Sequence, residues 1–133
     1  MWWLLMKYNF DPKSSIIALT VTLIGIKNEK KKIEMAFDTG ATYNLIPWDV
    51  AESLGYEPAF SKKKVNITTA SGIEKSPLIN VECISVLGKK AKNIECIIHD
   101  LPETSRVDGL LGLSFIRHFK IFLDFKKGVL EIE

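Results

Sequence analysis

The sequence has few of the residues that bind metal ions or build disulfide frameworks. It contains 2 cysteines and 2 histidines in 133 residues, and Cys83 and Cys96 form no CxxC pair and no cluster with histidine. Structural zinc sites need such closely spaced ligands, so we expect no metal site. Both cysteines fall in neighbouring strand-like runs, which leaves one disulfide open as an alternative, but buried free thiols are the interpretation that we favour.

The sequence also has no long apolar run near its start. The N-terminal segment Met1–Met6 is apolar but stops at Lys7, far short of the roughly 20 residues that a membrane-spanning helix requires. It has no basic leader and no clear small-residue cleavage site, so an aromatic-rich β-strand is a better interpretation of Trp2 and Trp3 than a secretory signal. We therefore expect no stable membrane insertion and a cytoplasmic location.

No large excess of one charge is present. The 18 basic and 16 acidic residues give a formal net charge of +2. The lysines gather in short groups at residues 30–32, 62–64, 89–90 and 126–127. These groups lie between apolar runs and no aromatic residues interleave with them, so solvated turns are favoured over a nucleic-acid patch. We expect no nucleic-acid partner.

What the sequence does have is the size and composition of one globular domain. Apolar residues make up 47% of the chain and charged residues 26%, which is typical of soluble globular proteins. The length suits one domain rather than two, and no tandem repeat or low-complexity linker interrupts it. We expect a single domain over residues 1–133, with residues 1–14 as an N-terminal extension or strand.

Strand-like segments dominate the chain. Residues 16–26 are dense in β-branched side chains, and residues 33–37 alternate apolar with polar positions, a pattern that predicts strands. Further strands are expected at residues 43–46, 65–69, 73 onward, 81–87, 94–99, 120–125 and 129–132, and polar turns at residues 28–32 and 88–93. Short helices are expected at residues 47–54 and 113–119. The fold class is therefore all-β, mainly strands with one or two short helices.

The turn Asp38-Thr39-Gly40-Ala41 places a carboxylate between two of these apolar runs. A carboxylate with hydrophobic walls on both sides needs hydrogen bonds, and backbone amides near Gly40 are suitable donors. Because glycine has no Cβ, the backbone can turn sharply there and let another group approach Asp38 closely. Alone, however, Asp-Thr-Gly is short enough to occur by chance as an ordinary turn.

A second motif, Leu110-Leu111-Gly112, follows later in the chain and precedes the second predicted helix. With both motifs in this order, the chain resembles the retropepsin-like aspartic proteases from about Ile16 to Ile132. The segment 108–116 is similar to the form seen in the cellular and prokaryotic, non-viral branch of that family. Thr42 and Tyr43 depart from viral members, which have acidic residues there, so the viral substrate preference does not carry over.

The resemblance implies a closed acid-protease-like β-barrel, one lobe per chain, without metal or organic cofactor. It assigns catalysis to Asp38, Thr39 and Gly40, and support of the active site to Leu110, Leu111 and Gly112. It assigns substrate binding to Gly40, Ala41, Thr42 and to a β-hairpin flap near residues 69–73 with Ala70, Ser71 and Gly72 at its tip. The implied substrate is an extended polypeptide, with selectivity that is mainly apolar and local.

A homodimer follows from the chemistry of such a site. Peptide hydrolysis by this route uses two carboxylates at one water, whereas this chain offers one Asp-Thr-Gly motif. The remaining aspartates lack that setting; they are Asp11, Asp49, Asp100, Asp108 and Asp124. A twofold axis beside Asp38 would bring it near its own copy and complete the active site.

Two other functions compete with this interpretation. His99 and His118 prompt a search for a serine or cysteine triad, but the segment around Ser114 lacks the second glycine of a nucleophile elbow. The stronger alternative is a retropepsin-fold dimer with little or no proteolysis that acts as a peptide-binding or assembly module, because a fold does not by itself determine a function.

Overall fold

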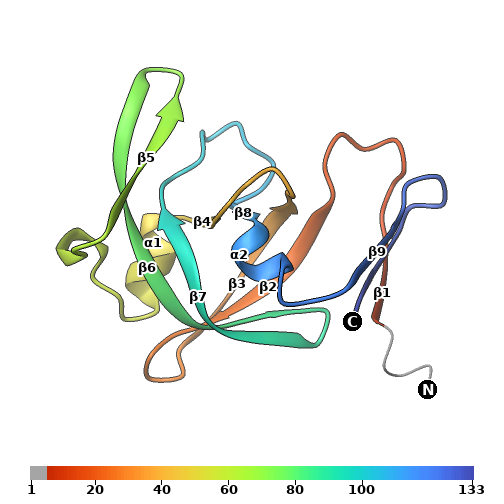
Figure 1. Ribbon diagram of the computed structural model, residues 1–133, viewed down its shortest axis with the longest axis horizontal. Helices are drawn as coiled ribbons and strands as arrows, with labels where there is room; N and C mark the ends of the chain where they lie inside the picture. Colours follow the sequence, from red (N-terminus) through yellow and green to blue (C-terminus); the bar gives the residue numbers. More distant parts are fainter. Residues whose placement is uncertain (1–5) are drawn as a thin grey trace.

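The computed structural model describes residues 6–133 (Figure 1). Its strands are β1 (Met6–Asn9), β2 (Ala18–Ile24), β3 (Lys30–Phe37), β4 (Asn44–Ile46), β5 (Lys64–Thr69), β6 (Gly72–Val86), β7 (Lys89–Ile98), β8 (Gly109–Leu111), β9 (Ile121–Asp124) and β10 (Val129–Ile132). Its helices are α1 (Trp48–Ser53) and α2 (Leu113–Ile116), with a 3₁₀ helix, η2 (Pro58–Phe60). The predicted strand at Trp2 and Trp3 lies outside the described residues.

Six of the strands close into a barrel. They pair in the order β2-β3-β8-β4-β7-β6, and a further β2–β6 pairing joins the two ends. Most neighbours are antiparallel, but β3 pairs in parallel with β8, and β4 in parallel with β7. The mainly β class and the closed barrel expected from the sequence are therefore confirmed.

The barrel forms because its strands alternate in hydrophobicity. In β2, Leu19, Val21 and Leu23 are buried while Thr20 is exposed, the period of two that one buried face of a strand requires. The helix α2 adds the fully buried Phe115 to the same core. This core holds the loops at the barrel rim, where the motif residues lie.

The long strand β6 differs from the sequence expectation of separate strands at residues 73 onward and 81–87. Pro77, which cannot donate a ladder hydrogen bond, lies inside it. The proline is tolerated because β6 changes partner there: Pro77 pairs with Lys64 of β5, and the next residue, Leu78, pairs with Ile97 of β7. One continuous strand thus serves both the barrel and the β5–β6 hairpin.

The predicted turn at residues 88–93 is also wrong. β6 and β7 are joined by a tight turn in which Leu87 and Gly88 have φ values of 50° and 77°, as two-residue hairpin turns require. The lysines that suggested a loop lie instead in β7, where Ala91 is buried between them. The helix α2 likewise stops at Ile116, short of the predicted residue 119.

Two structures extend from the barrel. Strands β1, β10 and β9 form a separate three-stranded antiparallel sheet, called here the terminal sheet, near the C-terminus of the chain (Figure 1). On the other side, β5 and the first half of β6 form a hairpin that projects beyond the barrel (Figure 1). The Asp38 turn and strand β8, which contains Leu110, lie between the terminal sheet and the hairpin.

Candidate active site

Asp38 lies immediately after β3, at the point where that strand meets β8. Its backbone N–H donates a 3.0 Å hydrogen bond to the carbonyl of Leu111, which extends the parallel β3–β8 pairing by one residue. Its half-buried carboxylate accepts a 2.9 Å hydrogen bond at Oδ1 from the backbone N–H of Gly40. A Cβ at position 40 would lie 3.2 Å from that oxygen, so glycine leaves room for this bond.

A buried asparagine fixes the loop that carries Asp38 to the second motif. The side-chain Oδ1 of Asn44 accepts a 2.7 Å hydrogen bond from the backbone N–H of Gly112. In return, the backbone N–H of Asn44 donates a 3.0 Å hydrogen bond to Oγ of Ser114. Ser114 Oγ itself donates to the carbonyl of Glu95 at 2.8 Å. These bonds tie β4, β7 and the start of α2 into one unit behind Asp38.

The other end of the Asn44 side chain contacts a buried thiol. Asn44 Nδ2 donates to Cys96 Sγ at 3.7 Å, and both residues are fully buried. Burial raises the pKa of the Cys96 thiol to about 12, although the hydrogen bond from Asn44 acts in the opposite direction. Cys83 and Cys96 are both free and buried, so neither has the exposed thiolate of a nucleophile.

Gly112 allows the closest approach between the two motifs. A Cβ at this position would lie 2.5 Å from the carbonyl oxygen of Tyr43 and 2.6 Å from that of Ala41. The backbone N–H of Leu113 also donates to the Ala41 carbonyl at 2.8 Å. The residue after the apolar pair must therefore be glycine for the Asp38 loop to pack against α2.

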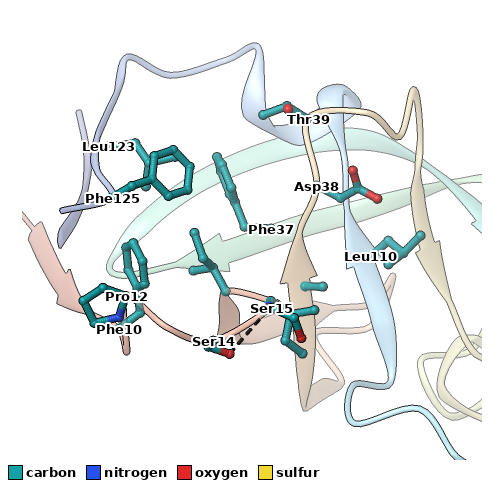
Figure 2. A pocket seen from close by; sticks show the side chains of 13 residues that line it. Phe10, Pro12, Ser14, Ser15, Phe37, Asp38, Thr39, Leu110, Leu123 and Phe125 are labelled. Carbon is teal, nitrogen blue, oxygen red and sulfur yellow. Dashed lines mark hydrogen bonds between the residues drawn. The ribbon is translucent and has the colours of Figure 1, made fainter. Parts of the chain in front are cut away.

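A hollow of about 430 Å³, called here the Asp38 hollow, opens between this loop and the terminal sheet. Figure 2 shows Phe10, Pro12, Leu123 and Phe125 on one side of it and Asp38 on the other, with Phe37 between them. Thr39 and Leu110 also line this hollow. Asp38 thus borders an open, largely apolar space on the side of the molecule that faces the terminal sheet.

Two further hollows lie toward the β5–β6 hairpin. The Ala41 hollow, about 260 Å³, is lined by Ala41, Thr42, Tyr43, Leu45, Val65, Asn66, Ile97 and Leu110. The hairpin hollow, about 530 Å³, includes Leu45, Ile67, Thr69, Ala70, Ser71, Glu74, His99 and Leu110 in its lining. Leu110 borders all three hollows, so its side chain links the Asp38 side of the site to the hairpin side.

Comparison with known proteins agrees with this geometry. Residues 19–115 match the aspartyl protease family. The chain belongs to the aspartyl protease family. The crystal structure of a retropepsin-like aspartic protease from Rickettsia conorii superposes with a TM-score of 0.72 and 24% sequence identity, over 96% of this chain and 89% of that one. This aspartyl protease chain therefore has the retropepsin-like fold. Among curated proteins, no match to the sequence was found.

Most of the site residues expected from the sequence of this aspartyl protease lie around one region of the barrel rim. Asp38, Thr39 and Leu110 line the Asp38 hollow, and Ala41 and Thr42 line the Ala41 hollow. Ala70 and Ser71 lie at the end of the hairpin and line the hairpin hollow, and Gly72, with φ of 122°, begins β6 beside them. Leu111 and Gly112 are buried behind the Asp38 turn.

Asn44 is the member of the site that sequence reasoning missed. The signal was an amide in the short apolar run Tyr43-Asn44-Leu45-Ile46, where a buried polar side chain needs partners. In the part of the chain that the structure describes, neither histidine forms a hydrogen bond or ion pair with the Asp38 loop. His118 is exposed after α2. His99 follows β7, and its backbone N–H donates a 3.0 Å hydrogen bond to the carbonyl of Ile46. Within residues 6–133 no group of three or more His, Cys, Asp or Glu side chains is placed to hold a metal ion, and no helix is long and apolar enough to cross a bilayer.

Proposed function

We propose that this chain is an aspartic endopeptidase that hydrolyses peptide bonds at Asp38. The observation that carries the proposal is the Asp38 carboxylate itself, held at Oδ1 by the Gly40 N–H at 2.9 Å and bordering an open hollow. A carboxylate that is oriented by a backbone amide and still accessible can act on a water molecule. Membership of the aspartyl protease family supports the same chemistry.

The proposed reaction needs a second carboxylate at the same water. One carboxylate, ionised, removes a proton from the water, while the other, protonated, polarises the scissile carbonyl. Because the chain has one Asp-Thr-Gly motif, the second group in the proposal is the partner subunit's Asp38. Two carboxylates so close together cannot both ionise at low cost, so in the proposal the pair shares one proton.

The terminal sheet and the Asp38 hollow support the homodimer that this reaction requires. Phe125, which lines the Asp38 hollow, is 64% exposed, and an exposed aromatic side chain beside an apolar hollow is typical of an interaction surface. Within residues 6–133, β9 pairs with β10 alone, so its outer edge is available to another strand. We propose that a second copy covers this face, with Thr39 bracing the paired loops across the twofold axis.

The β5–β6 hairpin is proposed as the flap that closes over the substrate. Its tip residues Ala70 and Ser71 line the hairpin hollow together with Leu45 and Leu110, so a peptide in the cleft would lie between the hairpin and the barrel rim. An extended peptide can add backbone hydrogen bonds in the manner of a strand. Gly40, Ala41 and Thr42 are proposed to contact it on the barrel side, and Ala70, Ser71 and Gly72 on the hairpin side.

The proposal is tested by cleavage of unfolded polypeptides or a peptide library by the purified protein, at acidic to mildly acidic pH. Asp38→Asn is expected to abolish cleavage and leave the protein folded and dimeric, because the substitution is nearly isosteric but removes the ionisable group. Asp49→Asn, at an exposed position in α1, is the matched control and should retain activity. Cleavage that persists in Asp38→Asn would overturn the assignment, and a stable dimer with no cleavage of any substrate would favour a peptide-binding or assembly module.

A further inference from the structure

We propose that Glu74 makes one subsite of the cleft selective for a basic side chain, lysine or arginine, in the substrate. This inference rests on the proposed function, because it concerns the substrate of the same cleft. The β5–β6 hairpin carries its charged side chains on different faces. Residues directly opposite in an antiparallel pair share a face, and Glu74 is opposite Ile67. Glu74 therefore lies on the face that also carries Val65 and Ile67.

That face is the one turned toward the barrel. Along β5, Val65 and Ile67 are half-buried, whereas the alternate residues Asn66 and Thr68 are exposed. Val65 lines the Ala41 hollow, and Ile67 and Glu74 line the hairpin hollow. The lysines of the hairpin have the opposite orientation: Lys64 and Lys75 alternate with these positions along β5 and β6 and are exposed. The inner face of such a hairpin is usually apolar and its outer face polar, so a carboxylate among the inward residues is unusual.

The chemistry of the hairpin hollow fits a long side chain with a cationic end. Leu45, Leu110 and Leu101 give it apolar walls, and no lysine or arginine belongs to its lining. Lysine and arginine bury their aliphatic stems against apolar surfaces and keep their charged ends near water or a carboxylate. With a volume of about 530 Å³ the hollow has room for such a side chain, and Glu74, 49% exposed at its side chain, supplies the carboxylate.

Of the two carboxylates that line the hairpin hollow, Glu74 and Asp100, Glu74 is the one proposed to bind the basic side chain of the substrate. His99 Nδ1 lies 3.9 Å from Glu74 Oε2, beyond hydrogen-bond distance, so this approach leaves room for a donor from a substrate. Asp100 also lines the hollow, but its Oδ1 accepts a 2.9 Å hydrogen bond from the backbone N–H of Trp48 at the start of α1. Asp100 therefore has a structural task, whereas the Glu74 carboxylate accepts no hydrogen bond among those of residues 6–133 and lies at ion-pair distance from His99 when that imidazole is protonated.

The experiment compares peptides that are identical except for one residue near the scissile bond, which is lysine, its uncharged near-isostere norleucine, or glutamate. The unmodified protein is expected to cleave the lysine peptides about fivefold faster in kcat/KM than the norleucine peptides, the range that a partly exposed ion pair gives. Glu74→Gln should remove this preference, and Glu74→Lys should reverse it in favour of glutamate. Glu82→Lys, at an exposed position of β6 outside the hollow, is the matched control and should keep the original preference.

Binding of the same peptides to the Asp38→Asn protein separates this inference from the proposed function. Tighter binding of lysine peptides that is lost in the double variant with Glu74→Gln supports the selectivity, even if the unmodified protein cleaves nothing. Equal binding and equal cleavage of lysine and norleucine peptides would overturn the selectivity while leaving proteolysis intact. A preference that survives in Glu74→Gln would assign it to another residue and would equally overturn the inference.

Discussion

The side-chain oxygen of Asn44 accepts a 2.7 Å hydrogen bond from the backbone N–H of Gly112, which joins the loop after Asp38 to the loop after Leu111. Both partners are buried, so water cannot replace either one. A buried N–H without a partner costs much more free energy than a hydrogen bond adds when it is made. The bond therefore holds the two motif loops in register with each other.

Asn44→Ala is expected to lower the free energy of unfolding by about 2 kcal/mol, because it leaves the buried Gly112 N–H without its acceptor and removes the donor to Cys96 Sγ. Urea unfolding measures this loss. The control is Asn80→Ala, at an exposed position of β6, which should change stability by less than about 0.5 kcal/mol. Equal stabilities of the two variants would show that the Asn44 bridge contributes nothing.

Because the Cys96 thiol is buried, we expect the free energy of unfolding to fall at alkaline pH. Its pKa is raised from 9.0 to about 12 by burial, so above about pH 9 the unfolded chain loses a proton that the folded chain retains, and the free energy of unfolding falls with rising pH. One such group contributes a slope of at most about 1.4 kcal/mol per pH unit. Tyr56, whose pKa burial also raises, adds a slope of the same sign.

Cys96→Ala should reduce this alkaline slope, because it removes the thiol whose pKa is raised by burial. The measurement is urea unfolding at a series of pH values between about 8 and about 11, the range in which the thiol of the unfolded chain ionises. The same slope in Cys96→Ala and the unmodified protein would assign the alkaline loss to Tyr56 or to another group.

The positions of most strands were predictable from the sequence, because the barrel strands alternate apolar and polar residues, and the helix α1 follows a proline. The closed barrel was implied by the resemblance to retropepsin-like proteases. The two motifs were also visible, since Asp38 and Gly112 lie in short, contiguous segments. The change of pairing partner along β6 was not visible in the sequence. No local pattern indicates that β6 continues through Pro77, pairing with β5 before it and with β7 after it. A propensity describes one segment, whereas a strand boundary depends on its neighbours.

The contacts around the site were predictable only in part, for the same reason. The Gly40 amide at Asp38 is a local bond and was expected from the turn. The bond between Asn44 and Gly112 joins segments that are far apart in sequence, so it becomes evident only when the barrel is closed. The inward position of Glu74 likewise depends on the register of the β5–β6 hairpin, which the alternation of one strand does not determine.

Phe125→Asp is expected to weaken the proposed dimer about tenfold or more, because it places a carboxylate in an apolar face where aromatic residues contribute much of the binding energy. Phe125 borders the Asp38 hollow and packs edge-on against Phe10, with ring centroids 6.3 Å apart. Sedimentation over a concentration series measures the dissociation constant. Phe60→Asp, at an 80% exposed position in η2, is the control, and an equal effect of both substitutions would contradict this interface.

Each active site is proposed to contain Asp38 from both subunits, and subunit-mixing experiments test this most directly. Unmodified and Asp38→Asn proteins are mixed in varying ratios at constant total concentration and allowed to exchange subunits before cleavage is measured. If a site needs two aspartates, random pairing in an equal mixture leaves about one quarter of the activity of the unmodified protein. If each chain acts alone, about one half remains, and that linear decline would contradict the shared site.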